Sequence, residues 1–365
     1  MRSELRTGVV LAVTVALLAL FLRNADLTSV WTELRRASPL PIVASVGVMA
    51  LVYLTRALRW QYLLAALGPT RFRTAFRTTV IGFALNTLLP ARPGEAVRPL
   101  LLARHEGLSF PAVLATIVVE RVLDLIAVLL LFGSFVVLFD PGMDTVDARL
   151  YRAIKLGGAA AAATAGVALA VMIGLAGHPE RLGRMTLTIE RIMPANLARK
   201  LARLVERFAG GFAAMRRPRD LFAALALSMP VWLGIALAVW MVARAFDLTF
   251  PFTGTFLLLA LLVVGVAVPT PGGIGGFHEA FRIGATAFYG FDNDRSVSCA
   301  LALHASQFVP VAAAGIFFMA QEGLSLGGIT RLAGKAKDAN DPLPGIVRPS
   351  VSEPWRAPGV GPRRK

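Results

Sequence analysis

The sequence predicts an all-α fold, a bundle of transmembrane helices that crosses a bilayer several times. Of its 365 residues, 56% are hydrophobic and only 16% are charged, which is below the roughly 25% of charged residues in soluble domains. The apolar residues gather in blocks of about 15 to 25, the length that a hydrocarbon core about 30 Å thick requires of a helix. Two blocks are interrupted by proline and glycine, which predicts irregular backbone at membrane depth.

Six apolar segments are long enough to cross the membrane. They are residues 7–22, 39–55, 112–139, 153–176, 221–245 and 298–320. The first follows two arginines in the manner of a signal peptide, but no small-x-small cleavage site comes after Leu22, so we expect a retained span. The two interrupted segments, 76–107 and 252–290, are either re-entrant helix pairs or further spans.

Charge in the connections predicts the orientation. Residues 178–220 carry ten Lys and Arg against four acidic residues, and residues 331–365 carry eight against three. The connection 140–152 carries three aspartates against two arginines. Because Lys and Arg are enriched in cytoplasmic connections, the first two segments should be cytoplasmic and the third external. We therefore expect a multi-pass protein of a bacterial-type inner membrane, with both termini cytoplasmic.

Six crossings satisfy this orientation if each interrupted segment enters and leaves on one side. The first would enter from the cytoplasm and the second from outside. Residues 23–38, which carry three arginines, fit the scheme less well.

We expect one membrane domain, residues 1–330, followed by a tail, residues 331–365. Six prolines alternate with small and charged residues in the tail, which predicts disorder. Residues 180–215, within the basic segment 178–220, repeat apolar side chains at helical spacing with arginines between them. This pattern predicts amphipathic helices on the anionic head groups of the inner leaflet, or equally helices that pack on the protein's own cytoplasmic face.

Composition excludes several other classes. The formal net charge is +16, but topology and anionic lipids account for it, and no zinc-finger or aromatic RNA-binding motif accompanies it. We expect no nucleic-acid partner. The single cysteine, Cys299, excludes an intramolecular disulfide. The run His278-Glu279 resembles a metalloprotease motif, but Arg282 stands where the second histidine would be. We expect no metal, no cofactor and no catalytic residues.

The two interrupted segments share a pattern that predicts a repeat. The first reads FALNTLLPARPGEAVR (83–98) and the second reads VVGVAVPTPGGIGGFHE (263–279). Each joins an apolar arm to a Pro-Gly turn, a glutamate and a second short helix. Segments that enter from opposite sides form an inverted repeat, and paired broken helices of this kind mark the substrate site in transporters. The alternative is an ordinary loop at the membrane edge.

Broken helices need polar partners inside a membrane. Proline removes a backbone donor, and the freed carbonyls cost several kcal/mol in hydrocarbon unless they face protein or water. The helices that resume after Gly94 and Gly276 would present free N–H groups and a partial positive charge, which suit an anionic phosphate. Asn86, in the arm before the first turn, is expected to satisfy freed backbone groups or to face the substrate.

Charged residues also interrupt the segment 112–139, which contains Glu120, Arg121 and Asp124. Only 15 residues run from Leu125 to Phe139, about 22 Å of helix, which is too short to cross alone. Part of the charged turn must therefore lie below the interface, where Arg121 can pair with Asp124. The turn is either a structural cluster whose charges neutralise one another and join the helices, or the polar wall of a cavity for a lipid head group.

Arginines near the first break are candidate phosphate ligands, namely Arg92 and Arg98. Arg56 and Arg59 lie beside Trp60 at the cytoplasmic end of the second span, where we interpret them as side chains that extend to the interface. The candidate substrate-binding residues are Asn86, Arg92, Gly94, Glu95, Arg98, Glu120, Arg121, Asp124, Pro271, Gly272, Gly273, Gly276 and Glu279.

These motifs, in their order along the chain, resemble those of a known family. They are Arg56-x-x-Arg59-Trp60, Asn86-x-x-Leu89-Pro90-x-Arg92-x-Gly94-Glu95-x-x-Arg98, Glu120-Arg121-x-x-Asp124 and Pro269-x-Pro271-Gly272-Gly273-Ile274-Gly275-x-x-x-Glu279. Across residues 5–325 the chain is similar to the lysylphosphatidylglycerol synthase transmembrane, or flippase-like, family. The resemblance implies a membrane region that moves an aminoacylated lipid between leaflets. In two-part members a soluble aminoacyltransferase domain makes that lipid.

About 45 residues follow the last expected span, so we expect no lipid aminoacylation by this chain. The resemblance to stand-alone members implies hopanoid or polyprenyl lipids as other substrates. A lipid translocase with no enzyme activity is therefore the leading hypothesis. No P-loop is present, so a gradient or simple equilibration would drive it. The alternatives are a lipid-modifying membrane enzyme, for which no nucleophile motif is found, and a scaffold or accessory subunit.

Overall fold

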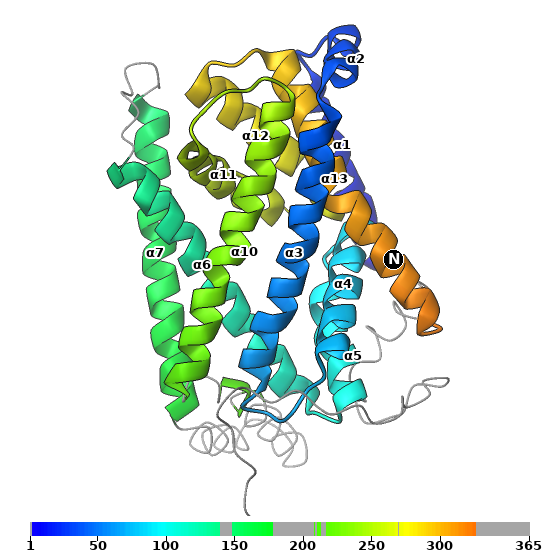
Figure 1. Cartoon of the computed structure of the whole chain (residues 1–365), viewed down its shortest axis with the longest axis vertical. Coiled ribbons are helices and arrows are strands. Elements are labelled where there is room, and N and C mark those ends of the chain that lie inside the picture. The colour runs from blue at the N-terminus through cyan, green and yellow to red at the C-terminus, as the bar shows by residue number, and fades with distance from the viewer. Residues whose placement is uncertain are drawn as a thin grey trace, which may run out of the picture.

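Six long helices that run roughly side by side form the frame of the protein (Figure 1). They are α1 (Arg2–Leu22), α3 (Pro39–Leu64), α6 (Phe110–Leu138), α7 (Ala148–Gly177), α10 (Pro218–Ala245) and α13 (Asn293–Gln321). The computed structural model describes residues 2–138, 148–177, 208, 210–212, 217–268 and 270–325, and the elements it describes there are all helical. The expectation of an all-α protein is confirmed for this part of the chain.

Five of the six expected spans fall within one of these helices, and the sixth, 112–139, ends one residue beyond α6, outside the described residues. Three of them, α3, α10 and α13, are long and apolar enough to cross a membrane by length and composition, and α1 with α2 (Leu27–Arg36) would add a fourth as one bent span. A multi-pass membrane protein is thus supported, while six crossings stay a prediction. The expected connection 140–152, most of the segment 178–220, Pro269 and the tail 331–365 lie wholly or largely outside the described residues.

The first interrupted segment forms two helices, α4 (Phe72–Leu88) and α5 (Gly94–Glu106), which pack against each other. The helix stops because Leu89 is extended and Ala91 and Arg92 adopt φ values of 64° and 51°, a left-handed region that interrupts a right-handed helix. The Asn86 side chain accepts a hydrogen bond from the Gly94 N–H (2.8 Å). That bond satisfies one of the free donors at the start of α5.

The second interrupted segment repeats this arrangement with α11 (Thr255–Ala267) and α12 (Gly276–Ile283). Between them lies a short 3-10 turn, Pro271–Gly273, in which Gly272 and Gly273 have φ values of 58° and 70°. In both segments, therefore, a proline precedes two consecutive left-handed residues. The second break uses glycines, which adopt this conformation without strain.

Glycine pairs hold each helix pair together. A Cβ on Gly94 would fall 1.8 Å from the Gly82 carbonyl oxygen, and a Cβ on Gly276 would fall 2.3 Å from the Gly265 carbonyl oxygen. Only glycine, which has no Cβ, can stand at these positions. The two helices of each pair therefore contact each other through their backbones. The equivalence of Gly82 with Gly265 is an internal similarity that the Pro-Gly pattern alone did not reveal.

The two helix pairs lie at opposite ends of the frame, α4 and α5 at one end and α11 and α12 at the other (Figure 1). Their breaks meet. Arg92 Nη2 donates to the carbonyl oxygen of Val266, at the end of α11. A Cβ on Gly272 would lie 3.3 Å from the Thr87 carbonyl oxygen of α4, so the two interruptions occupy one region between the ends.

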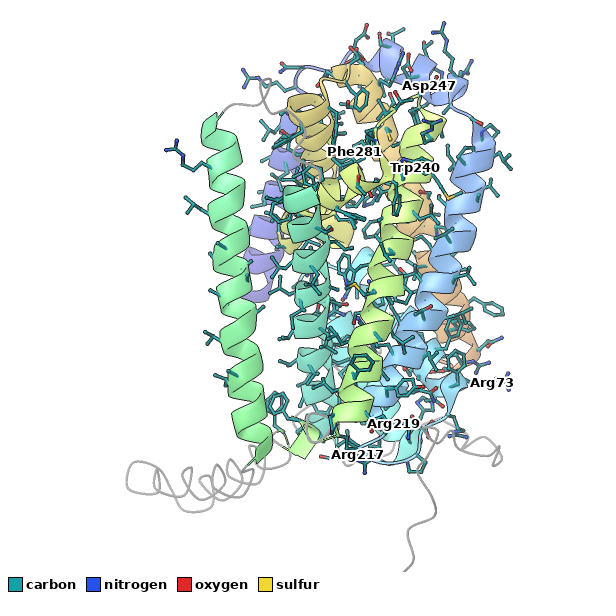
Figure 2. All side chains as sticks on the ribbon, turned by 60° about the vertical axis from the view of Figure 1, so that its left-hand side comes forward. Arg73, Arg217, Arg219, Trp240, Asp247 and Phe281 are labelled. Atoms are coloured by element: carbon teal, nitrogen blue, oxygen red, sulfur yellow. The ribbon has the colours of Figure 1, made fainter. Side chains whose placement is uncertain are left out.

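Charged residues lie at both ends of the frame. Figure 2 places Arg73, Arg217 and Arg219 at the end that holds α4 and α5, and Asp247 at the end that holds α11 and α12. The remaining short elements, α2, η4 (Phe252–Gly254) and the π-helical turn η6 (Gly284–Phe288), belong to the second end. We refer to the first end as the basic end.

Candidate functional site

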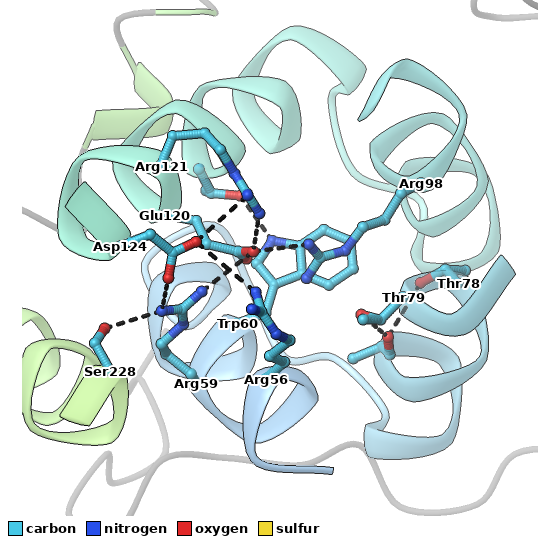
Figure 3. A network of polar contacts seen from close by, with 12 residues as sticks. Arg56, Arg59, Trp60, Thr78, Thr79, Arg98, Glu120, Arg121, Asp124 and Ser228 are labelled. Atoms are coloured by element: carbon cyan, nitrogen blue, oxygen red, sulfur yellow. Dashed lines mark hydrogen bonds and ion pairs between the residues drawn. The ribbon is translucent and has the colours of Figure 1, made fainter. Parts of the chain in front are cut away.

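Side chains from α3, α5 and α6 converge on one buried carboxylate, Glu120 (Figure 3). Its Oε1 atom accepts hydrogen bonds from Arg98 Nη1 (2.9 Å) and from Arg121 Nη2 (2.8 Å). Arg59 Nη2 lies 3.2 Å from the same oxygen. Three guanidinium groups from three helices therefore share one acceptor.

Asp124, one helical turn further along α6, is the second acceptor. Its Oδ1 atom accepts from Arg59 Nη1 (2.5 Å) and from the indole Nε1 of Trp232 on α10 (3.0 Å). Its Oδ2 atom lies 3.4 Å from Arg121 and 3.8 Å from Arg56. The expected i,i+3 pair of Arg121 with Asp124 is confirmed, and Asp124 also joins α10 to the cluster.

Helical spacing explains why these residues meet. Residues four apart lie on one helix face, so Glu120 and Asp124 both face α3. Arg56 and Arg59, three apart on α3, face back toward them. Glu120 lies ten residues after the start of α6 and Arg59 five before the end of α3, about 15 Å and 8 Å along their helices. The cluster is therefore nearer the basic end.

Aromatic rings line the arginines. The guanidinium carbon of Arg98 lies 3.8 Å from the centroid of the Trp60 ring, and that of Arg56 lies 5.1 Å from the centroid of Phe83. The Trp60 indole donates to Thr116 Oγ1 (2.9 Å), which fixes the ring. A cation over an aromatic face gains about 0.5 to 2 kcal/mol and keeps its N–H edges free for acceptors.

The chain matches a known protein family over most of its length. The model of the family described as "Lysylphosphatidylglycerol synthase TM region" matches residues 8–315. The chain belongs to this family. The match confirms the resemblance drawn from the sequence motifs and covers the buried cluster and both helix pairs.

Two curated relatives are similar to this member of the family. Glycosyltransferase AglD of Haloferax volcanii is 25% identical over 353 residues, which cover 87% of this chain and 54% of AglD. UPF0104 membrane protein MJ1595 of Methanocaldococcus jannaschii is 30% identical over 103 residues, 27% of this chain and 30% of that protein. The chain thus spans about half the length of AglD, and less of the second relative.

The structure brings together four of the expected substrate-binding residues of this family member, Arg98, Glu120, Arg121 and Asp124. Glu95 lies within electrostatic reach of Arg121 and of Arg92, which links the first break to the cluster. Two groups of expected residues shape the breaks themselves. They are Asn86 and Gly94 in the first and Pro271, Gly272, Gly273 and Gly276 in the second.

Glu279 lies apart from this cluster. Both of its carboxylate oxygens accept from Arg282, at 2.5 and 2.8 Å, and Arg282 also donates to Asn293 at the start of α13. When Gly94 is aligned with Gly276, the second helix pair has Ala280 at the position of Arg98. The first helix pair has Val97 at the position of Glu279. The two helix pairs therefore share their backbone contacts and differ in their chemistry.

The interpretation of Arg56 and Arg59 as side chains that extend to the interface is wrong. Arg59 is 0% exposed and Arg56 is 6% exposed, and both face Asp124. Ser228 and Trp232 of α10, which contact Arg59 and Asp124, were not anticipated. The available signal was the i,i+3 spacing of the two arginines opposite a helix that carries two carboxylates.

Proposed function

We propose that this chain is a lipid translocase, which moves an anionic or aminoacylated phospholipid-like lipid, or a polyprenyl or hopanoid lipid, between the leaflets of a bacterial-type inner membrane. One observation carries the proposal. The buried cluster of Glu120 lies beside two broken helix pairs that approach from opposite ends and touch at their breaks. Charge inside a membrane bundle is costly and marks substrate pathways.

In this proposal the two helix pairs are re-entrant and form an inverted repeat. The pair α4 and α5 enters from the cytoplasmic, basic end, and the pair α11 and α12 enters from outside. The matching glycine contacts, Gly82 with Gly94 and Gly265 with Gly276, support this relation. Inverted repeats of broken helices place the substrate between them.

The contacts between the breaks act as the closed barrier. Arg92 of the first break donates to the freed carbonyl of Val266, and His304 of α13 supports the second break, with its Nε2 atom 2.9 Å from the Gly272 carbonyl oxygen. Freed carbonyls need such partners away from water. Translocation requires these contacts to separate while the polar head group passes and the acyl chains stay in lipid. No covalent step is involved.

The proposed membrane placement follows the charges. Both termini are cytoplasmic, as is the basic segment 180–215, which binds anionic head groups of the inner leaflet. Arg73, Arg217 and Arg219, at the end that holds α4 and α5, support the cytoplasmic assignment of that end, whereas Arg282 and Arg295 at the other end are paired with Glu279 and Glu33.

A second function is an accessory or scaffold role in a lipid-modifying pathway, without transport. The observation that favours it is the similarity to AglD, which is named a glycosyltransferase and of which the chain covers 54%. In this case the membrane region would hold a lipid for an enzyme rather than move it.

A leaflet-accessibility assay in vesicles tests the proposal. Purified protein is reconstituted with lipids that carry a fluorescent acyl chain, and the fraction that an external quencher reaches is followed over time. We expect the wild type to speed exchange for at least one lipid class, and both Glu120→Gln and Arg92→Ala to slow it. Glu33→Gln and Arg295→Ala are matched controls, because this ion pair (3.3 Å) joins α2 and α13 at the far end.

Folded protein that exchanges no lipid class would reject translocation and favour the accessory role. Exchange that neither Glu120→Gln nor Arg92→Ala alters would leave a translocase but reject this site.

A further inference from the structure

The buried cluster carries more positive than negative charge. Four arginines, at positions 56, 59, 98 and 121, surround two carboxylates, Glu120 and Asp124. Because arginine stays protonated in proteins, the formal sum is +2 when both carboxylates are ionised. Adding Arg92 and Glu95, which lie within electrostatic reach, leaves the sum unchanged. A buried charge is costly unless it is paired. Arg121 is partly exposed, so among the described residues the buried arginines exceed the carboxylates by one charge, and Arg121 adds a second at the open side.

Several buried donors of the cluster lack a hydrogen-bond partner among the described residues, as do the carboxylate oxygens Glu120 Oε2 and Asp124 Oδ2. Arg98 is 3% exposed and uses Nη1 for Glu120, while its Nε and Nη2 atoms have no hydrogen-bond partner among the described residues. The N–H groups of Nε and Nη2 point the same way along one edge of the guanidinium group. Such an edge binds two oxygens of a phosphate at once. A buried donor without a partner destabilises the fold, and an acceptor in the ligand would satisfy it.

A second arginine offers a further donor. Arg56 is 6% exposed, and within the described part of the chain its Nη1 atom has no hydrogen-bond partner, since Asp124 Oδ2 is 3.8 Å away. Figure 3 shows the Arg56 and Arg98 side chains entering the cluster from different helices toward Glu120. Arg121, whose side chain is 41% exposed, contacts both carboxylates and gives the cluster its open side.

Lipid head groups differ in charge. A phosphate monoester carries about −1.5 to −2 at neutral pH, a phosphodiester such as phosphatidylglycerol carries one negative charge, and its lysyl ester carries a net positive charge. A net charge of +2 favours the first and opposes the last. The Trp60 ring that covers Arg98 leaves the guanidinium edge, rather than its face, as the contact for phosphate.

We propose that this cluster binds lipids whose head group ends in a phosphate monoester, with two phosphate oxygens on the Nε–Nη2 edge of Arg98 and a third on Arg56 Nη1. The inference rests on the proposed function, because it names the lipid class that the site of the translocase accepts. Among the lipids that the proposed function allows, phosphodiester lipids are weaker ligands and aminoacylated lipids are the weakest.

Equilibrium binding tests this inference without any transport measurement. The full-length protein in detergent micelles is titrated with four probes and followed by native mass spectrometry. Three are short-chain lipids with identical acyl chains, namely phosphatidic acid, phosphatidylglycerol and lysylphosphatidylglycerol, and the fourth is inorganic phosphate. We expect phosphatidic acid to bind at least about tenfold more tightly than phosphatidylglycerol, as the loss of one charged hydrogen bond predicts. The lysyl ester should bind most weakly.

Two variants of one residue locate the ligand. Arg98→Lys keeps the charge but loses the paired donors, so it should reduce the preference for phosphatidic acid by about tenfold or more. Arg98→Gln should abolish the preference. Arg295→Lys and Arg295→Gln are matched controls at the far end and should bind like the wild type. Breaking the buried pair with Glu120 lowers the stability of Arg98→Gln, so each variant is titrated at a temperature below its own melting transition, where a lost preference reports on binding and not on unfolding.

The possible outcomes separate the two proposals. Equal binding of phosphatidic acid and phosphatidylglycerol, or tighter binding of the lysyl ester, overturns the monoester inference even if the vesicle assay shows translocation. Inorganic phosphate that binds as tightly as phosphatidic acid overturns a lipid ligand. A monoester preference that depends on Arg98, found in a protein that translocates nothing, supports the binding site and rejects the translocase.

Discussion

Gly82 and Gly94 touch so closely that a Cβ on Gly94 would lie 1.8 Å from the Gly82 carbonyl oxygen and 2.7 Å from Asn86 Oδ1. This contact sets the position of α5 against α4, and so the position of Arg98, one turn beyond Gly94, against Glu120. A backbone contact outside the charged cluster therefore aligns one of its arginines.

The first prediction follows from this contact. Gly94→Ala should destabilise the protein by at least about 1 to 3 kcal/mol, since the added methyl group forces two backbones apart. Thermal unfolding in detergent measures the effect. Gly133→Ala in α6 is the control, because nothing lies within 4 Å of the added Cβ. Equal melting temperatures for both variants would contradict the packing described.

The second prediction concerns Glu120, whose Oε1 atom forms ion pairs with three arginines. Glu120→Gln should lower the free energy of unfolding by about 3 to 5 kcal/mol, the usual cost of removing one partner from a buried ion pair. Glu33→Gln removes the partner of Arg295, an exposed pair at the far end, and should cost less than about 1 kcal/mol. Denaturant unfolding of both variants checks the difference. A cost for Glu120→Gln no greater than that for Glu33→Gln would refute the structural role.

The third prediction compares two tryptophans of α10. The Trp232 indole donates to the Asp124 carboxylate (3.0 Å), and the Trp240 indole donates to the Phe250 carbonyl (3.1 Å). Trp232→Phe should cost about 1.5 to 3 kcal/mol and Trp240→Phe about 0.5 to 1.5 kcal/mol, because hydrogen bonds to charged acceptors are stronger. Melting temperatures in the opposite order would argue that Asp124 is not ionised.

The fourth prediction uses the strained first break. Ala91 has a φ of 64°, a conformation that favours glycine. Ala91→Gly should therefore stabilise the protein by up to about 1 kcal/mol. Ala96→Gly, in the first turns of α5, should destabilise it by roughly 0.5 to 1 kcal/mol. Thermal unfolding distinguishes the two signs, and a loss of stability in Ala91→Gly would contradict the left-handed conformation.

Much of the fold follows from local pattern. Apolar length predicts α3, α10 and α13, since a helix must satisfy its backbone within the hydrocarbon. The Pro-Gly runs predict both breaks, because proline cannot donate and glycine allows positive φ. The spacing of Arg121 and Asp124 predicts their ion pair, which helical geometry fixes.

The candidate site is harder to predict from the sequence, because its residues come from four helices. Arg59 is separated from Asp124 by 65 residues and Ser228 from Arg59 by 169. An arginine near the end of an apolar helix has the same local pattern whether it reaches the interface or is buried. Glu279 is the opposite case. Its sequence motif resembles that around Glu95, but its carboxylate pairs with Arg282, three residues away, and takes no part in the cluster.

The sequence by itself determined that this protein is helical and membrane-embedded, with two interrupted helical segments. Apolar segment length, proline and glycine determine these features because each affects only the backbone of the nearest residues. Only the tertiary structure decided that the breaks meet at Arg92 and Val266, and that four arginines surround two carboxylates. The physical reason is that the net charge of a buried cluster is the sum over all helices packed around it. No single stretch of the chain contains all of those charged residues.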